Sequence, residues 1–115
     1  MPDIAAEKIA RFFSIPSKES GDKAYFVAHN ASFDKRFIRA HCKRYNTKVY
    51  LPYISIDTVQ LAAMFLVPSG LENHKMDTIR EFLGWSTENA HTATKDCEDV
   101  VKLFDFFCLN WTAAL

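Results

Sequence analysis

The chain has 115 residues and no net formal charge, because 14 basic side chains balance 14 acidic ones. Hydrophobic residues make up 49% of the sequence and charged residues 24%, a balance typical of a soluble globular protein that excludes intrinsic disorder. A chain of this length forms at most one domain, so we expect residues 1–115 to fold as a single domain around a modest core.

Nothing in the sequence pattern predicts a membrane segment. The N-terminal residues lack the apolar run of a secretion signal, and the longest wholly apolar stretch, 61–67, is too short to span a bilayer. We therefore expect an intracellular protein, cytoplasmic or in another internal compartment. Cys42, Cys97 and Cys108 show no CxxC spacing and fall among apolar residues of predicted helices, which favours buried, reduced thiols over metal ligation or a redox role.

Apolar spacing and helix-breaking residues divide the chain into alternating elements. In chain order they predict a helix over 3–13, a loop over 14–23, a strand over 24–28, a helix over 32–45, a strand over 49–56, and helices over 58–66, 77–83 and 92–109. Two strands that are each followed by a helix are typical of a βαβ unit with parallel strands. Because a parallel pair normally lies inside a larger sheet, we expect exposed edges here.

Three details of this pattern concern particular side chains. The run 24–28 (AYFVA) is continuously apolar, which predicts a strand buried on both faces. Phe33 and Phe37 share a face of the helix that follows, and this face is predicted to be apolar. Asp57 and Asp77 each stand where a helix begins, so we expect both to be N-cap residues.

Positive charge is concentrated between residues 34 and 48. This stretch has a local balance of +5, with one acidic residue against Lys35, Arg36, Arg39, Lys43, Arg44 and Lys48. Such a stretch is either the solvated face of a helix or a patch that attracts phosphate groups. Charge alone does not decide between these two interpretations.

Two short segments carry residues suited to catalysis. Asp34 lies in the first turn of a helix that leaves a strand, a position that faces the cleft beyond the carboxyl ends of an open sheet. His91 and Asp96 lie at the start of the last helix. Carboxylates suit a hard cation such as Mg²⁺, and a neutral imidazole can take a proton from a metal-bound water. Taken singly, each residue also fits an ordinary cap or a hydrogen-bonded side chain.

These segments resemble motifs of the DEDDh family of 3′–5′ exonucleases, which includes the proofreading subunit of bacterial DNA polymerase. The string HNASFD at 29–34 is similar to the second motif of the family, and the H-x4-D spacing of His91 and Asp96 is similar to the third. The resemblance covers residues 5–108. It implies an α/β fold of the ribonuclease H-like class, here with two parallel strands flanked by about five helices.

The resemblance also implies a role for each matching residue. Asp34 and Asp96 would be metal ligands for Mg²⁺ or Mn²⁺, and His91 would be the general base. Asn30 and Phe33 would shape the pocket for the terminal nucleotide. Lys35 and Arg36, by their positive charge rather than by the motif, would attract the nucleic acid.

The first motif of the family, an Asp-x-Glu on the first strand, has no counterpart ahead of Asp34. Its carboxylates would complete a two-metal site, so we expect that site to be incomplete and the activity of this chain alone to be weak or absent. Without the strands that normally precede this segment, apolar surface would be left uncovered on Tyr25, Phe26, Tyr53 and Ile54. We therefore expect the isolated chain to self-associate, to borrow strands from a partner chain, or to be unstable.

Together these features predict a portion of a metal-dependent exonuclease that removes nucleoside 5′-monophosphates from the 3′ ends of single-stranded DNA or RNA. The alternative is a non-catalytic module, derived from such a domain, that binds nucleic acid or a protein partner. Metal binding distinguishes the two, because only the first needs it.

Overall fold

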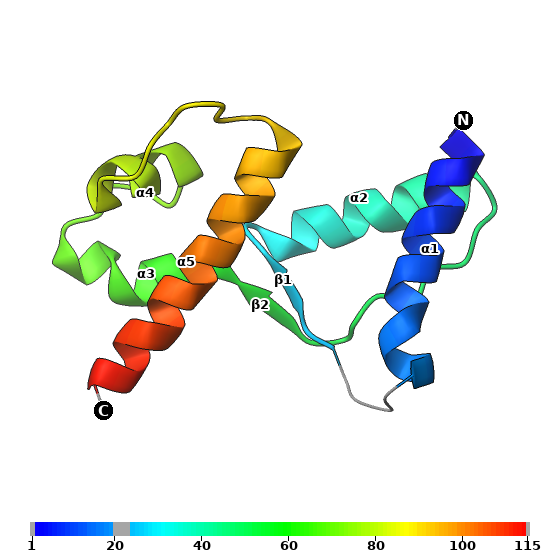
Figure 1. The fold of residues 1–115 in the computed structure, drawn as a ribbon, viewed down its shortest axis with the longest axis horizontal. Helices are drawn as coiled ribbons and strands as arrows, with labels where there is room; N and C mark the ends of the chain where they lie inside the picture. Colours follow the sequence, from blue (N-terminus) through cyan, green and yellow to red (C-terminus); the bar gives the residue numbers. More distant parts are fainter. Residues whose placement is uncertain (1, 20–23, 115) are drawn as a thin grey trace. The chain divides into compact units, whose positions relative to one another are not determined.

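A computed structural model describes residues 2–19 and 24–114, with side chains placed for 4–14 and 24–110. Its elements are α1 (Pro2–Glu19), β1 (Phe26–Ala28), α2 (Ala31–Arg44), β2 (Ser55–Asp57), α3 (Thr58–Phe65), the short 3-10 helix η1 (Val67–Ser69), α4 (Met76–Leu83) and α5 (Ala93–Ala114) (Figure 1). Within these ranges the two strands pair in parallel, which confirms the predicted α/β class. None of the described helices is long and apolar enough to cross a membrane.

The chain divides into two compact units, Met1–Ile56 and Asp57–Leu115, and each is considered by itself. Unit 1 contains α1, β1 and α2, and unit 2 contains α3, α4 and α5. The expectation that residues 1–115 form one domain stays a prediction.

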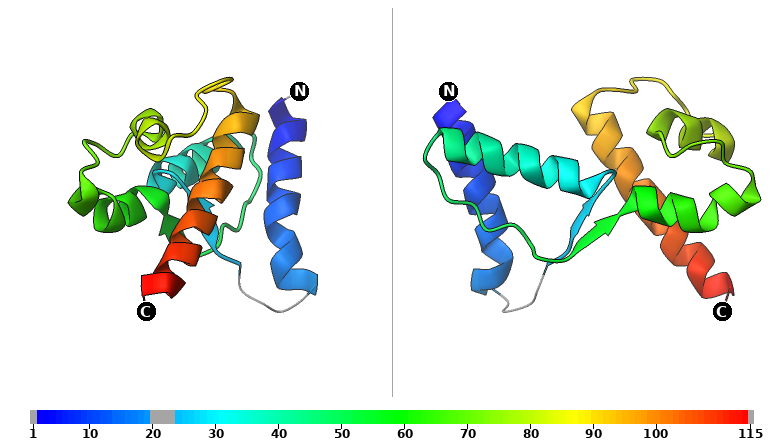
Figure 2. Two further views of the ribbon diagram at one scale, coloured as in Figure 1. Left: turned by 60° about the vertical axis from the view of Figure 1, so that its left-hand side comes forward. Right: turned by 180° about the vertical axis from the view of Figure 1, so that it is seen from behind.

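The core of unit 1 is small. Phe26, Ala28 and Ala31 are buried in it, and the rings of Phe13 and Phe26 stack with their centroids 5.9 Å apart. Figure 2 shows that α1, which carries Phe13, crosses α2. Helix α1 therefore shields the inner face of β1, where Phe26 lies.

Helix α1 is longer than the sequence predicts. It continues past residue 13 and through Pro16 to Glu19, so residues 14–19 are helical rather than part of a loop. The proline ring holds φ near the helical value and removes one backbone donor, which a helix tolerates at some cost in stability. The rest of the predicted loop, residues 20–23, lies outside the described residues.

The strands are short, and only one face of β1 is covered. Phe26 and Ala28 point inward, whereas Val27 between them is exposed, so the expected burial on both faces is wrong. As predicted, apolar surface is uncovered beside the strands, with Tyr53 96% exposed and Tyr25 also exposed. Phe26 departs from that prediction because Phe13 stacks on it.

The buried face of α2 is not the one that the apolar residues indicate. Phe33 and Phe37 are 53% and 66% exposed, whereas Ala31, Lys35 and Cys42 are buried. The Lys35 ammonium donates hydrogen bonds to backbone carbonyl groups in the segment before β2, and this fixes which face turns inward.

Unit 2 has the larger core. Its buried residues are Ala62, Leu66, Leu71, Ile79, Leu103 and Phe107, which α3, the segment after it, α4 and α5 contribute. The buried face of α5 runs through Asp99, Leu103 and Phe107. Cys97 and Cys108 consequently lie on the exposed side of α5, contrary to expectation, whereas Cys42 in unit 1 is buried as predicted.

One of the two predicted helix caps is confirmed. The Asp57 carboxylate accepts a hydrogen bond from the backbone N–H of Val59 at 2.9 Å and caps α3. The prediction for Asp77 is wrong, because α4 begins one residue earlier with Lys75 at the N-cap. The Asp77 side chain binds Arg80 instead, at 2.9 Å.

A buried ion pair joins α4 to α5. Arg80 Nε and Asp99 Oδ2 are 2.6 Å apart, and the two side chains are only 1% and 3% exposed. Burial by itself would raise the pKa of Asp99, but hydrogen bonds from Arg80 and Lys95, together with their positive charges, lower it below its ordinary value. Asp99 is therefore ionised in the folded chain at neutral pH.

The cap at Asp57 leads to a first prediction. Replacing Asp57 with Ala leaves a backbone donor of α3 without its partner, and we expect the free energy of unfolding to fall by about 1 kcal/mol. Asp57→Asn retains an oxygen acceptor and should change it by only a few tenths of a kcal/mol. Urea denaturation followed by circular dichroism measures both. Equal losses in the two variants would contradict the capping role.

The ion pair between Arg80 and Asp99 leads to a second prediction, on the pH dependence of stability. Because its folded pKa is lowered, its contribution to stability is present above about pH 4, the unfolded value, and is lost as the pH falls through the folded pKa. We expect Asp99→Asn to cost about 3 kcal/mol at pH 7 and to weaken the fall of stability below pH 4. Urea denaturation from pH 2 to pH 7 tests this, with Asp105→Asn, an exposed position on α5, as control.

Candidate functional site

Three carboxylates surround the Arg80 guanidinium in unit 2. Besides the bond from Nε to Asp99, Nη1 lies 2.9 Å from Asp77 Oδ1 and Nη2 lies 2.9 Å from Asp96 Oδ1. Burial alone would lower the pKa of Arg80, but the three hydrogen bonds raise it above its ordinary value. The guanidinium is therefore a permanent charge within this group.

His91 joins the same group from the turn before α5. Its side chain is 79% exposed, and its Nε2 lies 3.1 Å from Asp77 Oδ2. The His91 backbone has a φ of 71° and donates its N–H to Asp96 Oδ1 at 3.3 Å. Lys95 completes the group, with its Nζ 3.1 Å from Asp99 Oδ1. The structure thus brings together the two residues of the H-x4-D motif.

Helical spacing explains why these side chains meet. Asp77 and Arg80 are three residues apart on α4, and Asp96 and Asp99 are three apart on α5, so each pair shares a face of its helix. Sequence reasoning identified His91 and Asp96 but missed Arg80 and Asp99. Each of the two is a charged residue at a core-facing position of its helix, and this pattern was the signal for them. Arg80 follows the buried Ile79 in α4, and Asp99 lies four residues before the buried Leu103 in α5.

The other predicted site residues lie at the start of α2, in unit 1. Asn30 is the N-cap residue in a left-handed conformation, with φ of 69°, and its carbonyl accepts the N–H of Phe33 at 3.1 Å. Asp34 follows in the first turn and is half-buried, whereas Phe33 and Arg36 are exposed. These residues form one local group, separate in the chain from the group in unit 2.

Lys35 has an internal role. Its ammonium lies 2.7 Å from the carbonyl oxygen of Pro52, 3.3 Å from that of Tyr53 and 5.4 Å from the centre of the Phe26 ring. Burial, assisted by the nearby charge of Arg39, lowers the pKa of Lys35. The side chain therefore links α2 to the segment before β2 and directs its charge inward.

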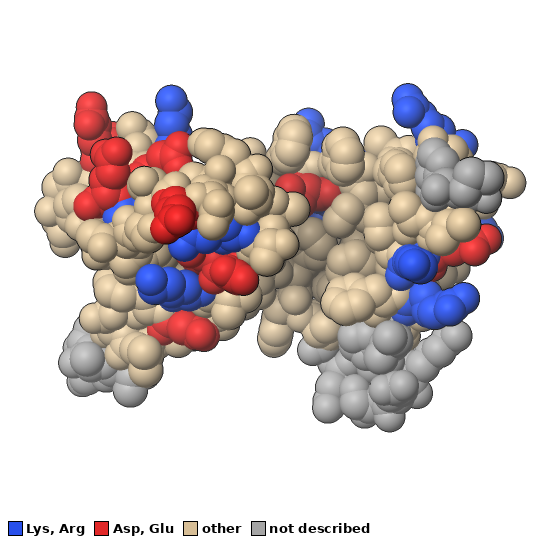
Figure 3. All heavy atoms as spheres, turned by 45° about the horizontal axis from the view of Figure 1, so that its top comes forward, with Lys and Arg blue, Asp and Glu red and all other residues tan. Residues whose placement is uncertain are grey.

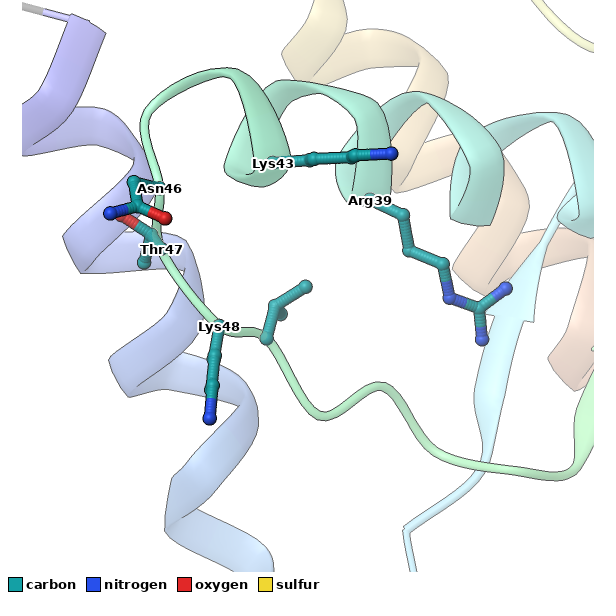
Figure 4. Close-up of a pocket in the computed structure, with 6 residues that line it drawn as sticks. Arg39, Lys43, Asn46, Thr47 and Lys48 are labelled. Atoms are coloured by element: carbon teal, nitrogen blue, oxygen red, sulfur yellow. The ribbon is translucent and has the colours of Figure 1, made fainter.

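A pocket of about 610 Å³ adjoins the C-terminal part of α2. Figure 4 shows its lining: Arg39 and Lys43 from α2, followed by Asn46, Thr47, Lys48 and Val49. Three cations and no acidic residue line it, so it is suited to an anion. On the face of unit 2 seen in Figure 3, by contrast, basic and acidic side chains lie side by side. The +5 stretch of sequence was the signal for this pocket, although Lys35 is not part of it.

Carboxylates are the donors that Mg²⁺ prefers, but the described residues do not complete a metal site. Among the side chains placed in 4–14 and 24–110, no group of three or more His, Cys, Asp or Glu residues is arranged to hold an ion. One oxygen of Asp96 already accepts from Arg80 and from His91. A divalent cation would therefore need ligands beyond those described here.

Comparison with known proteins finds relatives that are similar to most of this chain. "Ribonuclease T" of Salmonella typhimurium is 34% identical over 97 residues, which are 82% of this chain and 44% of that protein. "Ribonuclease T" of Haemophilus ducreyi is 36% identical over 104 residues, 88% of this chain and 47% of that protein. "DNA polymerase III PolC-type" of Caldanaerobacter subterraneus is 32% identical over 81 residues, 70% of this chain and 6% of that protein.

The chain spans less than half the length of these ribonuclease T relatives. No solved structure matches it significantly. The Exonuclease family matches residues 17–104, a range that includes Asp34, His91 and Asp96. Because this match covers most of the sequence and both motifs, the chain belongs to the Exonuclease family.

Proposed function

We propose that this chain forms part of a 3′–5′ exonuclease that releases nucleoside 5′-monophosphates from single-stranded nucleic acid. The observation that carries the proposal is the meeting of His91 and Asp96 at the Arg80 group, in a chain of the Exonuclease family. The name ribonuclease T points to RNA as the substrate, and the PolC-type polymerase points to DNA. RNA is favoured because the ribonuclease T matches cover more of the chain.

His91 acts as the general base in this proposal. Its exposed ring is held at Nε2 by Asp77 Oδ2, 3.1 Å away. The tautomer that carries its proton on Nε2, beside Asp77 Oδ2, leaves Nδ1 to accept a proton from the attacking water. Asp77 fixes the ring orientation, and the exposure of the ring allows a substrate to approach it.

Asp34 in unit 1 and Asp96 in unit 2 are each proposed as a ligand of Mg²⁺ or Mn²⁺, and further ligands come from elsewhere. Asn30 and Phe33 lie beside Asp34 at the start of α2 and shape the place of the terminal nucleotide, where the exposed Phe33 ring offers a stacking surface for a base. Arg36 is exposed on the same helix and attracts phosphate. Lys35 does not contact the substrate in this proposal, because its ammonium donates a hydrogen bond to the Pro52 carbonyl inside unit 1.

The pocket of Arg39, Lys43 and Lys48 extends this binding surface in unit 1. Three cations around one hollow attract the phosphates of a single strand that runs along α2. The uncovered apolar side chains of Tyr25 and Tyr53, beside the short strands, support a second copy of the chain or a strand-donating partner.

A non-catalytic binding module is the second candidate. It is favoured by the incomplete set of metal ligands among the described residues and by the engagement of Asp96 with Arg80. In this case the chain binds nucleic acid through the basic pocket without cleaving it.

Cleavage distinguishes the two candidates. We expect the chain to shorten a 3′-labelled RNA oligonucleotide slowly in Mg²⁺ or Mn²⁺, and His91→Ala to be about 100-fold slower because the general base is lost. His74→Ala, which removes an exposed histidine of the same unit, is the matched control and should retain the rate. Equal rates for the wild type and His91→Ala would contradict the role of His91. Binding without cleavage would favour the second candidate.

The salt dependence of oligonucleotide binding tests the pocket. Removing Lys43 and Lys48 should weaken binding and reduce the slope of log K against log salt by about 0.7 for each lost phosphate contact. Fluorescence anisotropy with a labelled single strand, measured from about 50 to about 300 mM salt, gives this slope. Lys75→Ala, an exposed lysine of unit 2, is the control. An unchanged slope in the double variant would exclude the pocket from the binding surface.

A further inference from the structure

We propose that Arg80 is a positioning residue that fixes Asp96 with a single carboxylate oxygen left open to an external ligand. The proposal rests on the proposed function, because Asp96 belongs to the exonuclease motif. Arg80 itself is 1% exposed and therefore acts through the carboxylates that it holds.

The hydrogen bonds and ion pairs of the three aspartates carry this inference. Both oxygens of Asp77 are engaged, by Arg80 and by His91, and both oxygens of Asp99 are engaged, by Arg80 and by Lys95. Asp96 Oδ1 accepts from Arg80 and from the backbone of His91. Within residues 4–14 and 24–110, Asp96 Oδ2 is the remaining carboxylate oxygen of this group, with no protein donor.

The depth of Arg80 determines which oxygen of Asp96 is held. Asp99 is 3% exposed and anchors the guanidinium from the buried side, whereas Asp96 is 47% exposed. The fixed, planar fork of an arginine reaches three carboxylates at once, and the point charge of a lysine does not. Arg80 therefore ties Asp96 Oδ1 to the core and leaves Oδ2 without a protein donor among the described residues.

The charges of the group agree with this arrangement. Three carboxylates face Arg80 and Lys95, which leaves one net negative charge when His91 is neutral. A divalent cation is thus attracted to the group but is not needed to neutralise it. We expect such a cation to meet Asp96 Oδ2 while Arg80 stays in place, rather than to displace the guanidinium.

Nuclear magnetic resonance of the whole chain tests the positioning. Three-bond Hα–Hβ couplings should report one Asp96 side-chain rotamer in the wild type and averaged rotamers in Arg80→Gln and Arg80→Lys. Glu81→Gln, which removes an exposed charge from the same helix, should retain one rotamer. The methyl signals of Ile79 and Leu103 report the fold independently, so averaging at Asp96 with unchanged methyl signals separates positioning from a general structural role. One rotamer in a folded Arg80→Gln chain would overturn the proposal.

Magnesium alone, added to the wild type, supplies a test that needs no variant and decides the matter where both Arg80 variants unfold. Because the described residues do not complete a metal site, we expect the Asp96 carboxylate carbon to shift only at high Mg²⁺ concentration, while the Arg80 Nε–H signal persists. Loss of the Arg80 signal at the same Mg²⁺ concentrations would show that the guanidinium is displaced, and would overturn the proposal. A single rotamer with no response to Mg²⁺ would contradict the metal site of the proposed function and leave the positioning intact.

Discussion

The arrangement of unit 2 depends on one buried guanidinium. An arginine taken out of water is costly unless its donors are satisfied, and removing one partner of a buried ion pair costs about 3–5 kcal/mol. Arg80 meets this requirement with Asp77 on its own helix and with Asp96 and Asp99 on α5. The same hydrogen bonds hold a residue of the exonuclease motif in position, because Asp96 is one of the three partners of Arg80. Folding and the candidate site therefore share a single set of interactions.

Unit 1 also contains a buried cation whose hydrogen-bond donors must be satisfied, Lys35. Lys35 is buried against the ring of Phe26 and satisfies its charge with two backbone carbonyl groups, so its position selects the face of α2 that turns inward. Turning that face inward leaves Phe33 and Phe37 on the exposed side. The basic stretch of the sequence is thus divided between one structural cation and the cations around the pocket.

The order of the elements, the cap at Asp57 and the motif of His91 and Asp96 follow from local signals, and these could be predicted from the sequence. The buried faces of α2 and α5 could not, because apolar periodicity assigns every charged residue to the surface. Lys35 and Asp99 are charged residues inside those faces, and each is stabilised by a partner distant in sequence. The sequence likewise predicts Asp77 as the cap of α4, because its position at the start of the helix is a local signal. Its actual partners, Arg80 and His91, become apparent only in the folded structure.

The fold of unit 2 does not depend on a metal, although the candidate site shares its interactions. The carboxylates of unit 2 are balanced to within one charge by Arg80 and Lys95, so α4 and α5 are held together by the protein's own cations. Metal sites that build a fold contribute their binding energy to folding, and removing the metal unfolds the chain. Here the only carboxylate oxygen without a protein donor, among the described residues of this group, belongs to the exonuclease motif. A dependence of activity on divalent cations would consequently reflect the reaction rather than the stability of unit 2.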